Sequence, residues 1–263
     1  MSYKEDSLDK VIGSLGFSFS SLPFRNGDVD IREVTQSADF FLEARFNYFD
    51  ISSEYRRAAT ATIDALSTRY SRYSYCLSTT ESSLDNYLPR FERLGIGYYD
   101  FFALENNAVT RESVSLLRKE KDEGRIKHLG LRWTGDAETL RGKLRAHEGI
   151  EYVILPLTVS DFLLTSGRKK CYDVAVEEHV PVIIETEGRE RTEGSFPEEK
   201  RKELEKRHPS WPLFQWNLRF LYSLDGVVTV SMPLDGLDTT KAAIKALRGF
   251  SALENDERAL LLK

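Results

Sequence analysis

Residues 99–131, YDFFALENNAVTRESVSLLRKEKDEGRIKHLGL, decide the fold. The apolar run Tyr99–Leu104 predicts a buried strand, and Glu112–Glu123 has the helical spacing of apolar residues that predicts a helix. Gly124 follows that helix at the position where glycine commonly ends one. A second apolar run, His128–Leu131, then predicts another buried strand. Because a helix joins two buried strands, the stretch indicates a parallel sheet covered by helices.

The same strand and helix pattern recurs along the whole chain. The spacing of the strands averages roughly 33 residues, which leaves room for one helix and two short loops. Helices are also predicted over Ile31–Ala44, with Asp28 or Asp30 as N-cap, and over Asp136–Ala146. The pattern predicts an α/β protein, a single closed (β/α)8 barrel over residues 1–263. The eight predicted strands are Leu15–Phe19, Phe46–Phe49, Tyr73–Leu77, Tyr99–Leu104, His128–Leu131, Tyr152–Leu155, Val180–Ile184 and Gly226–Val230.

Composition excludes several functional classes. The 263 residues include 37 basic and 42 acidic ones, and this net charge of -5 argues against a nucleic-acid partner. The polar N-terminus and the lack of a long apolar run predict no export signal and no membrane segment, so we expect a cytoplasmic protein. Cys76 and Cys171 are expected to be reduced thiols, and the four scattered histidines give no metal-ligand spacing.

One segment departs from the repeating pattern. Residues 188–208, GRERTEGSFPEEKRKELEKRH, are almost wholly charged and follow the seventh predicted strand. The segment reads either as a solvated loop with a short exposed helix or as a flap over the barrel mouth.

Four short motifs, in the correct order, resemble the aldo-keto reductase superfamily, in particular its bacterial branch that often carries a ferredoxin-like extension. Leu15-Gly16-Phe17 is similar to the opening LGFG strand, and Asn47-Tyr48-Phe49-Asp50 followed by Tyr55 is similar to N-x-F-D-T-A-x-x-Y. Residues 94–100 and 123–130 resemble the entries to the family's fourth and fifth strands. We expect no iron-sulfur extension, because no cysteine-rich segment is present.

The resemblance implies NADPH-dependent carbonyl reduction by an Asp, Tyr, Lys and His tetrad at the barrel mouth. Asp50 and Tyr55 match this tetrad, whereas the lysine position falls on Thr80 and the histidine position on Glu105. Tyr55, the implied proton donor, would lose a neighbouring cation and gain an anion. Both changes would raise its pKa and weaken it as a general acid at neutral pH.

The positions that hold the cofactor in the family are altered too. They read Gly130-Leu131-Arg132-Trp133 instead of G-x-S-N and Pro156-Leu157-Thr158 instead of Q-Y-N. The Gly-rich turn and the later E-N become Ser231-Met232-Pro233 and Ala242-Ala243, and the second glycine of LGFG becomes Ser18. We therefore expect no bound cofactor, with NADPH implied by the resemblance alone.

Arg132 and Trp133 would place charge and bulk where the nicotinamide would lie. Arg132 could reach Glu105 and form a buried pair that fills the site, or it could present a free guanidinium to a carboxylate or phosphate ligand. Asp50, without its lysine, needs new hydrogen-bond donors, and Ser52 or Thr80 are the nearest candidates.

Three functions remain open from the sequence. The first is a binding or scaffolding protein that no longer reduces carbonyls. The second is a non-redox lyase or isomerase that uses Glu105 and Tyr55 as an acid/base pair, with Arg132 gripping an anionic small molecule. The third is an NADPH-dependent reductase with altered chemistry. Ligand identity and oligomeric state are left open.

Overall fold

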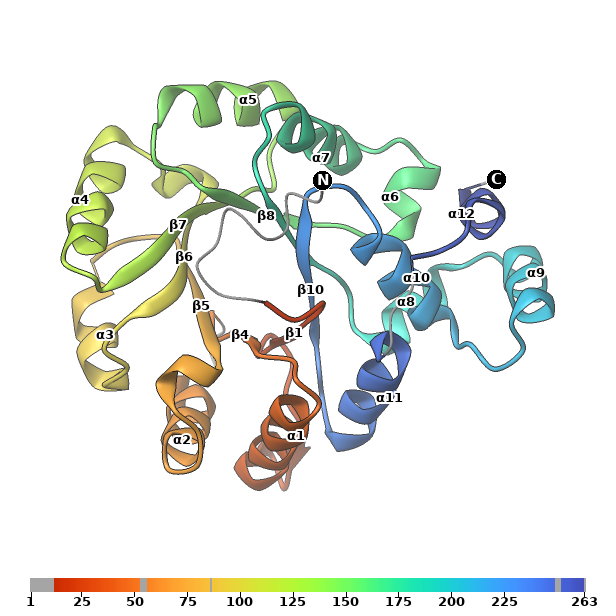
Figure 1. The fold of residues 1–263 in the computed structure, drawn as a ribbon, viewed down its shortest axis with the longest axis horizontal. Helices are drawn as coiled ribbons and strands as arrows, with labels where there is room; N and C mark the ends of the chain where they lie inside the picture. The colour runs from red at the N-terminus through yellow and green to blue at the C-terminus, as the bar shows by residue number, and fades with distance from the viewer. Residues whose placement is uncertain (1–11, 53–55, 86, 249–251, 263) are drawn as a thin grey trace.

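Eight parallel strands close into a barrel in the order β1-β10-β9-β8-β7-β6-β5-β4 (Figure 1). The computed structural model describes residues 12–52, 56–85, 87–248 and 252–262. This architecture confirms the prediction of an α/β barrel. The barrel strands are β1 Leu15–Ser18, β4 Tyr48–Asp50, β5 Cys76–Glu81, β6 Tyr99–Glu105, β7 Ile126–Arg132, β8 Tyr152–Pro156, β9 Val182–Glu185 and β10 Val227–Pro233.

Helices surround the barrel, and four of the described ones, α1, α4, α5 and α7, begin at a side chain that caps them. Asp30, Thr110 and Asp136 each accept a hydrogen bond from the backbone N–H three residues later. The described helices are α1 Ile31–Glu43, α2 Arg56–Ser67, α3 Tyr87–Leu94, α4 Arg111–Asp122, α5 Ala137–Ala146, α6 Val159–Leu163, α7 Gly167–Glu177, α8 Arg189–Ser195, α9 Glu198–Arg207, α10 Leu213–Tyr222, α11 Leu237–Leu247 and α12 Asn255–Leu262. None of these helices is long and apolar enough to cross a membrane.

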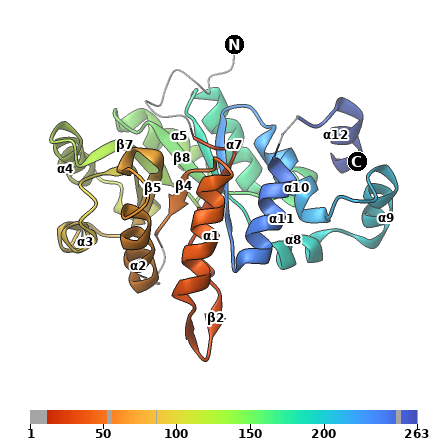
Figure 2. The same cartoon turned by 60° about the horizontal axis from the view of Figure 1, so that its bottom comes forward.

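The structure departs from the predicted elements in several places; for example, two helices, α6 and α7, follow β8 where one was expected. The third strand begins at Cys76 instead of Tyr73, because residues 72–74 form a 3-10 turn. Arg72 stabilises that turn by donating to the carbonyl oxygens of Tyr75 and Tyr98 at 2.9 and 2.7 Å. A short hairpin, β2 Phe24–Arg25 and β3 Asp28–Val29, precedes α1 and projects beyond its start (Figure 2). Three helices, α8 to α10, follow β9 where one helix was expected.

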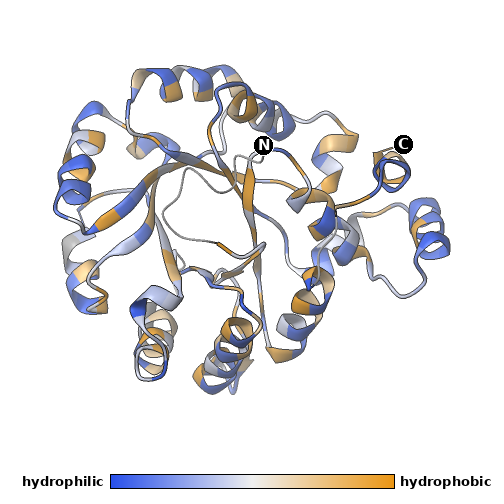
Figure 3. Cartoon of the chain, in the orientation of Figure 1, coloured by the Kyte–Doolittle hydropathy of each residue, from blue (hydrophilic) through white to orange (hydrophobic). Residues whose placement is uncertain are grey.

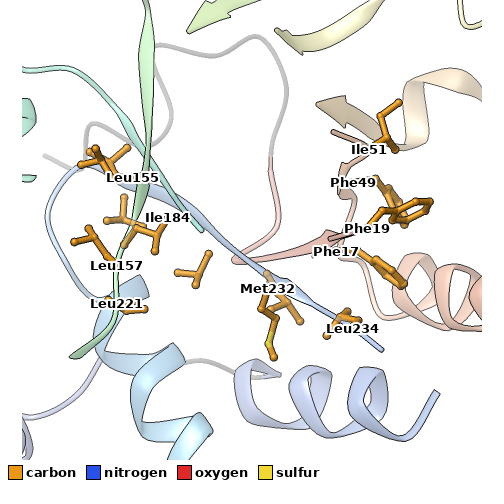
Figure 4. Packing of buried hydrophobic residues seen from close by; sticks show 14 of the residues in the cluster. Phe17, Phe19, Phe49, Ile51, Leu155, Leu157, Ile184, Leu221, Met232 and Leu234 are labelled. Atoms are coloured by element: carbon orange, nitrogen blue, oxygen red, sulfur yellow. The ribbon is translucent and has the colours of Figure 1, made fainter. Parts of the chain in front are cut away.

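The strands alternate their side chains between the barrel interior and the surrounding helices. Phe17 and Phe49 from neighbouring strands pack outward, with ring centroids 5.7 Å apart (Figure 4). Inside the barrel, Phe101 meets Tyr152 edge to face at 5.3 Å and Tyr48 at 5.6 Å. The interior is therefore filled by aromatic rings below the mouth, and the polar residues at the carboxyl ends of the strands form its upper surface.

Candidate functional site

The barrel mouth holds a cavity of about 740 Å³. Hydroxyl, carboxylate and guanidinium groups dominate its walls, and no aromatic, lysine or histidine residue belongs to the part of its lining that the structure describes. The lining comprises Ser18, Ser20, Ser21, Asp50, Ser52, Thr80, Glu105, Arg132, Pro156, Leu157, Thr158, Arg168, Glu185, Thr186, Glu187, Gly188, Arg189, Glu190, Arg191, Ser231, Pro233 and Asp235.

Asp50 ends β4 and is held by hydroxyl groups. Ser18 Oγ donates to Asp50 Oδ2 at 3.2 Å. Ser52 donates twice to Asp50 Oδ1, from its backbone N–H at 3.0 Å and from its hydroxyl. The hydroxyl of Ser52 also accepts the backbone N–H of Thr80 at 2.8 Å. Ser52 therefore supplies the new donor that the sequence led us to expect, whereas the hydroxyl of Thr80 has no hydrogen-bond partner among the described residues.

Arg132 ends β7 and pairs chiefly with Glu185 at the end of β9. Its Nε lies 2.8 and 3.1 Å from the two Glu185 carboxylate oxygens, and its Nη2 lies 2.8 Å from Oε2. Glu105 is a second partner, with its Oε1 3.7 Å from Arg132 Nη1. The expected pair with Glu105 is thus the weaker of two, and it does not fill the site, because the cavity remains beside it.

Glu185 was missed by sequence reasoning. Burial raises the pKa of its carboxyl group, and the charges of Asp50 and Glu105 add to this, while the hydrogen bond and charge of Arg132 act in the opposite direction. The available signal was its position: Glu185 directly follows the predicted strand Val180–Ile184, as Glu105 follows Tyr99–Leu104. Carboxyl ends of parallel strands meet at one face of a barrel.

Trp133 lies outside the cavity, which corrects its assignment as a ligand-site residue. Its side chain is 3% exposed and packs in the apolar layer between the barrel and the helices. Its indole N–H donates to the Asp136 carbonyl oxygen at 2.9 Å. Trp133 directly follows β7, and because successive residues along an extended chain face opposite sides, Arg132 points to the mouth and Trp133 away from it. Tyr55 lies outside the described residues.

The charged segment 188–208 has two parts. Residues 188–191 line the cavity and thus border the mouth. Helix α9 is mostly hydrophilic and lies outside the ring of barrel helices (Figure 3). Among the described residues, no group of three or more His, Cys, Asp or Glu residues could hold a metal ion.

Solved structures with the same architecture cover almost the whole chain, although no family model and no curated protein matches it. An aldo-keto reductase from Bacillus halodurans, 20% identical, has a TM-score of 0.74 over 97% of this chain and 92% of its own. The chain has the aldo-keto reductase fold. An aldo-keto reductase from Klebsiella pneumoniae in complex with NADPH, 13% identical, has a TM-score of 0.76 over 95% of this chain and 90% of its own. A glycerol dehydrogenase from Gluconobacter oxydans, 13% identical, has a TM-score of 0.75 over 97% of this chain and 92% of its own.

The aldo-keto reductase fold gives the mouth residues their context. Asp50, Thr80, Glu105 and Arg132 come from four successive barrel strands, and the structure brings all four to the wall of one cavity. The geometry offers ion pairing and hydrogen bonding to a polar molecule. Whether a dinucleotide can bind there depends on the charge of this wall and on the space beside it.

Proposed function

We propose that this barrel with the aldo-keto reductase fold does not reduce carbonyls with NADPH and instead binds a small polar molecule in its mouth. The ion pair between Arg132 and Glu185 carries this proposal. It runs from β7 to β9 and passes the end of β8, the region in which the resemblance places the nicotinamide. A nicotinamide ring would have to displace two charged groups that satisfy each other.

The proton-transfer groups support the same conclusion. Among the described residues, Asp50 is hydrogen-bonded to Ser18 and Ser52 rather than to a cation. The described cavity wall provides no lysine or histidine, the side chains that most readily donate or tune a proton near neutral pH. Within the described part of the wall, a carbonyl oxygen would find no cation-assisted acid of the kind that the reductase chemistry requires.

The residues present also fit NADPH poorly. Within the described wall, Asp50, Glu105 and Glu185 give three carboxylates against one guanidinium, which repels the phosphate groups of a dinucleotide. At the rim, three arginines (Arg168, Arg189 and Arg191) face an equal number of acidic residues (Glu187, Glu190 and Asp235), so the rim residues that the structure describes carry no net positive charge that would compensate. The described wall offers no aromatic ring on which a nicotinamide could stack.

The two alternative functions receive less support. The non-redox enzyme requires Arg132 as an anchor for an anion, yet Glu185 already occupies this guanidinium. The altered reductase is supported by the similarity to the Klebsiella protein in complex with NADPH. At 13% identity, this similarity supports the fold alone. A ligand-binding role needs only the cavity and its polar wall.

Titration of the purified protein with NADPH and NADH tests the proposal. We expect no heat of binding by calorimetry, no quenching of tryptophan fluorescence and no oxidation of NADPH in the presence of aldehydes. An NADPH-binding aldo-keto reductase measured in the same buffer is the positive control. Saturable NADPH binding coupled to turnover of any aldehyde would overturn the proposal.

A further inference from the structure

We infer that the cavity selects a polyhydroxylated molecule that carries positive charge, such as an amino sugar. This inference rests on the proposed function, because it takes the same cavity to be free for a ligand other than NADPH. Two features of the inner wall support it: the balance of its charges, and the hydroxyl groups that lie among the charged side chains. Both features belong to residues at or near the carboxyl ends of barrel strands.

Among the described residues, the charge of the inner wall is negative. Arg132 is the single cation among its strand-end residues, and Glu185 engages it through both carboxylate oxygens. The Glu105 side chain is 41% exposed, and its one ion-pair partner among the described residues lies 3.7 Å away, beyond hydrogen-bond range. Glu105 therefore presents a carboxylate to the cavity, where a protonated amine would make a charge-assisted hydrogen bond.

The hydroxyl groups of the wall have unused hydrogen-bonding capacity. Ser231, which is 2% exposed and lines the cavity, has no hydrogen-bond partner for its Oγ among the described residues. The buried Oγ1 of Thr80 has none there either. Since buried polar groups in proteins are normally satisfied, these atoms indicate a missing partner. Because a hydroxyl both donates and accepts, a polyol matches them better than a group that only accepts.

The size of the cavity sets the scale of the ligand. A volume of about 740 Å³ falls in the range of sites that take drug-sized molecules, which accommodates a disaccharide. An acidic sugar would meet Glu105 and Asp50 as like charges and would have to compete with Glu185 for Arg132. An amino sugar would compensate the negative wall instead.

Calorimetric titration with three disaccharides of different charge tests the inference: the glucosamine dimer (cationic), cellobiose (neutral) and digalacturonate (anionic). We expect the dimer to bind at least roughly tenfold more tightly than cellobiose, the ratio that one charge-assisted hydrogen bond provides, with digalacturonate weakest. NADPH is titrated in parallel. Saturable NADPH binding would defeat the proposed function itself, whereas its absence leaves the sugar results to decide the inference alone.

Two variants assign the effect to the cavity. Glu105→Gln should bring the affinity for the dimer down to that for cellobiose, whereas Glu199→Gln, exposed on α9 outside the cavity, should change nothing. Ser231→Ala should weaken the binding of the dimer and of cellobiose by the same factor. It should leave the midpoint of unfolding unchanged, because the Ser231 hydroxyl has no hydrogen-bond partner among the described residues to lose. Equal binding of all three sugars, tighter binding of digalacturonate, or no binding of the dimer would overturn the inference.

Discussion

The guanidinium of Arg132 and the carboxylate of Glu185 form three contacts at 2.8 to 3.1 Å, from strands β7 and β9 that are separated by β8. The pair therefore connects two parts of the barrel wall that share no backbone hydrogen bonds. Both side chains are mostly buried, at 28% and 21% exposure. Loss of one partner leaves the other with an uncompensated charge, and this gives the first prediction.

Arg132→Ala should destabilise the protein more at high pH than at low pH. Burial holds the folded-state pKa of Glu185 above its ordinary value, so stability declines as pH rises from the unfolded to the folded pKa. Without Arg132 that pKa rises further, and the decline extends to higher pH. Urea unfolding should show a small cost near about pH 5 and a cost of about 1–3 kcal/mol near about pH 8.

Two further variants separate the pair from general effects. In the Glu185→Gln background, Arg132→Ala should lose its pH dependence, because the titrating group is gone. Arg189→Ala removes an exposed partner of Glu193 and should cost at most about 0.5 kcal/mol at any pH. A cost of Arg132→Ala that is the same across this pH range would contradict the assignment to Glu185.

Ser52→Ala should lower the free energy of unfolding by about 1–3 kcal/mol. The substitution removes the hydroxyl that donates to buried Asp50 and accepts the Thr80 N–H. Chemical denaturation measures this directly. Ser21→Ala is the matched control, since Ser21 is exposed, lines the same cavity and makes no hydrogen bond among the described residues. Equal stability of the two variants would show that Ser52 does not hold Asp50.

Thr80→Lys combined with Glu105→His should fail to create an NADPH-dependent reductase. The double variant restores the residue types that the resemblance implies, but Arg132 and Glu185 still lie across the mouth. We expect no aldehyde-dependent loss of NADPH absorbance above that of the parent protein. Turnover gained by these two changes alone would mean that the cofactor site is intact and that the pair does not block it.

The sequence predicted the barrel because its strands are marked by apolar runs and separated by helices of regular length. It also placed Asp50, Glu105 and Arg132 at the mouth, since each directly follows a predicted strand, and it placed Thr80 there through the family resemblance. It gave the wrong orientation for Trp133, because the side of a strand that a residue faces depends on the register of the whole barrel. It missed Glu185, whose role depends on a partner more than fifty positions away.

Gly130 shows how that register constrains a residue that looked like part of a cofactor motif. A Cβ on Gly130 would lie 2.3 to 2.5 Å from the buried ring of Tyr152 inside the barrel. Gly130→Ala should therefore overpack the interior and lower the free energy of unfolding, measured in urea, by about 1–3 kcal/mol.

Gly142, within α5, has open space around its Cβ position. Gly142→Ala should stabilise the protein by about 0.5–1 kcal/mol, because alanine favours the helix. If both substitutions shifted stability in the same direction, Tyr152 would not fill the space above Gly130.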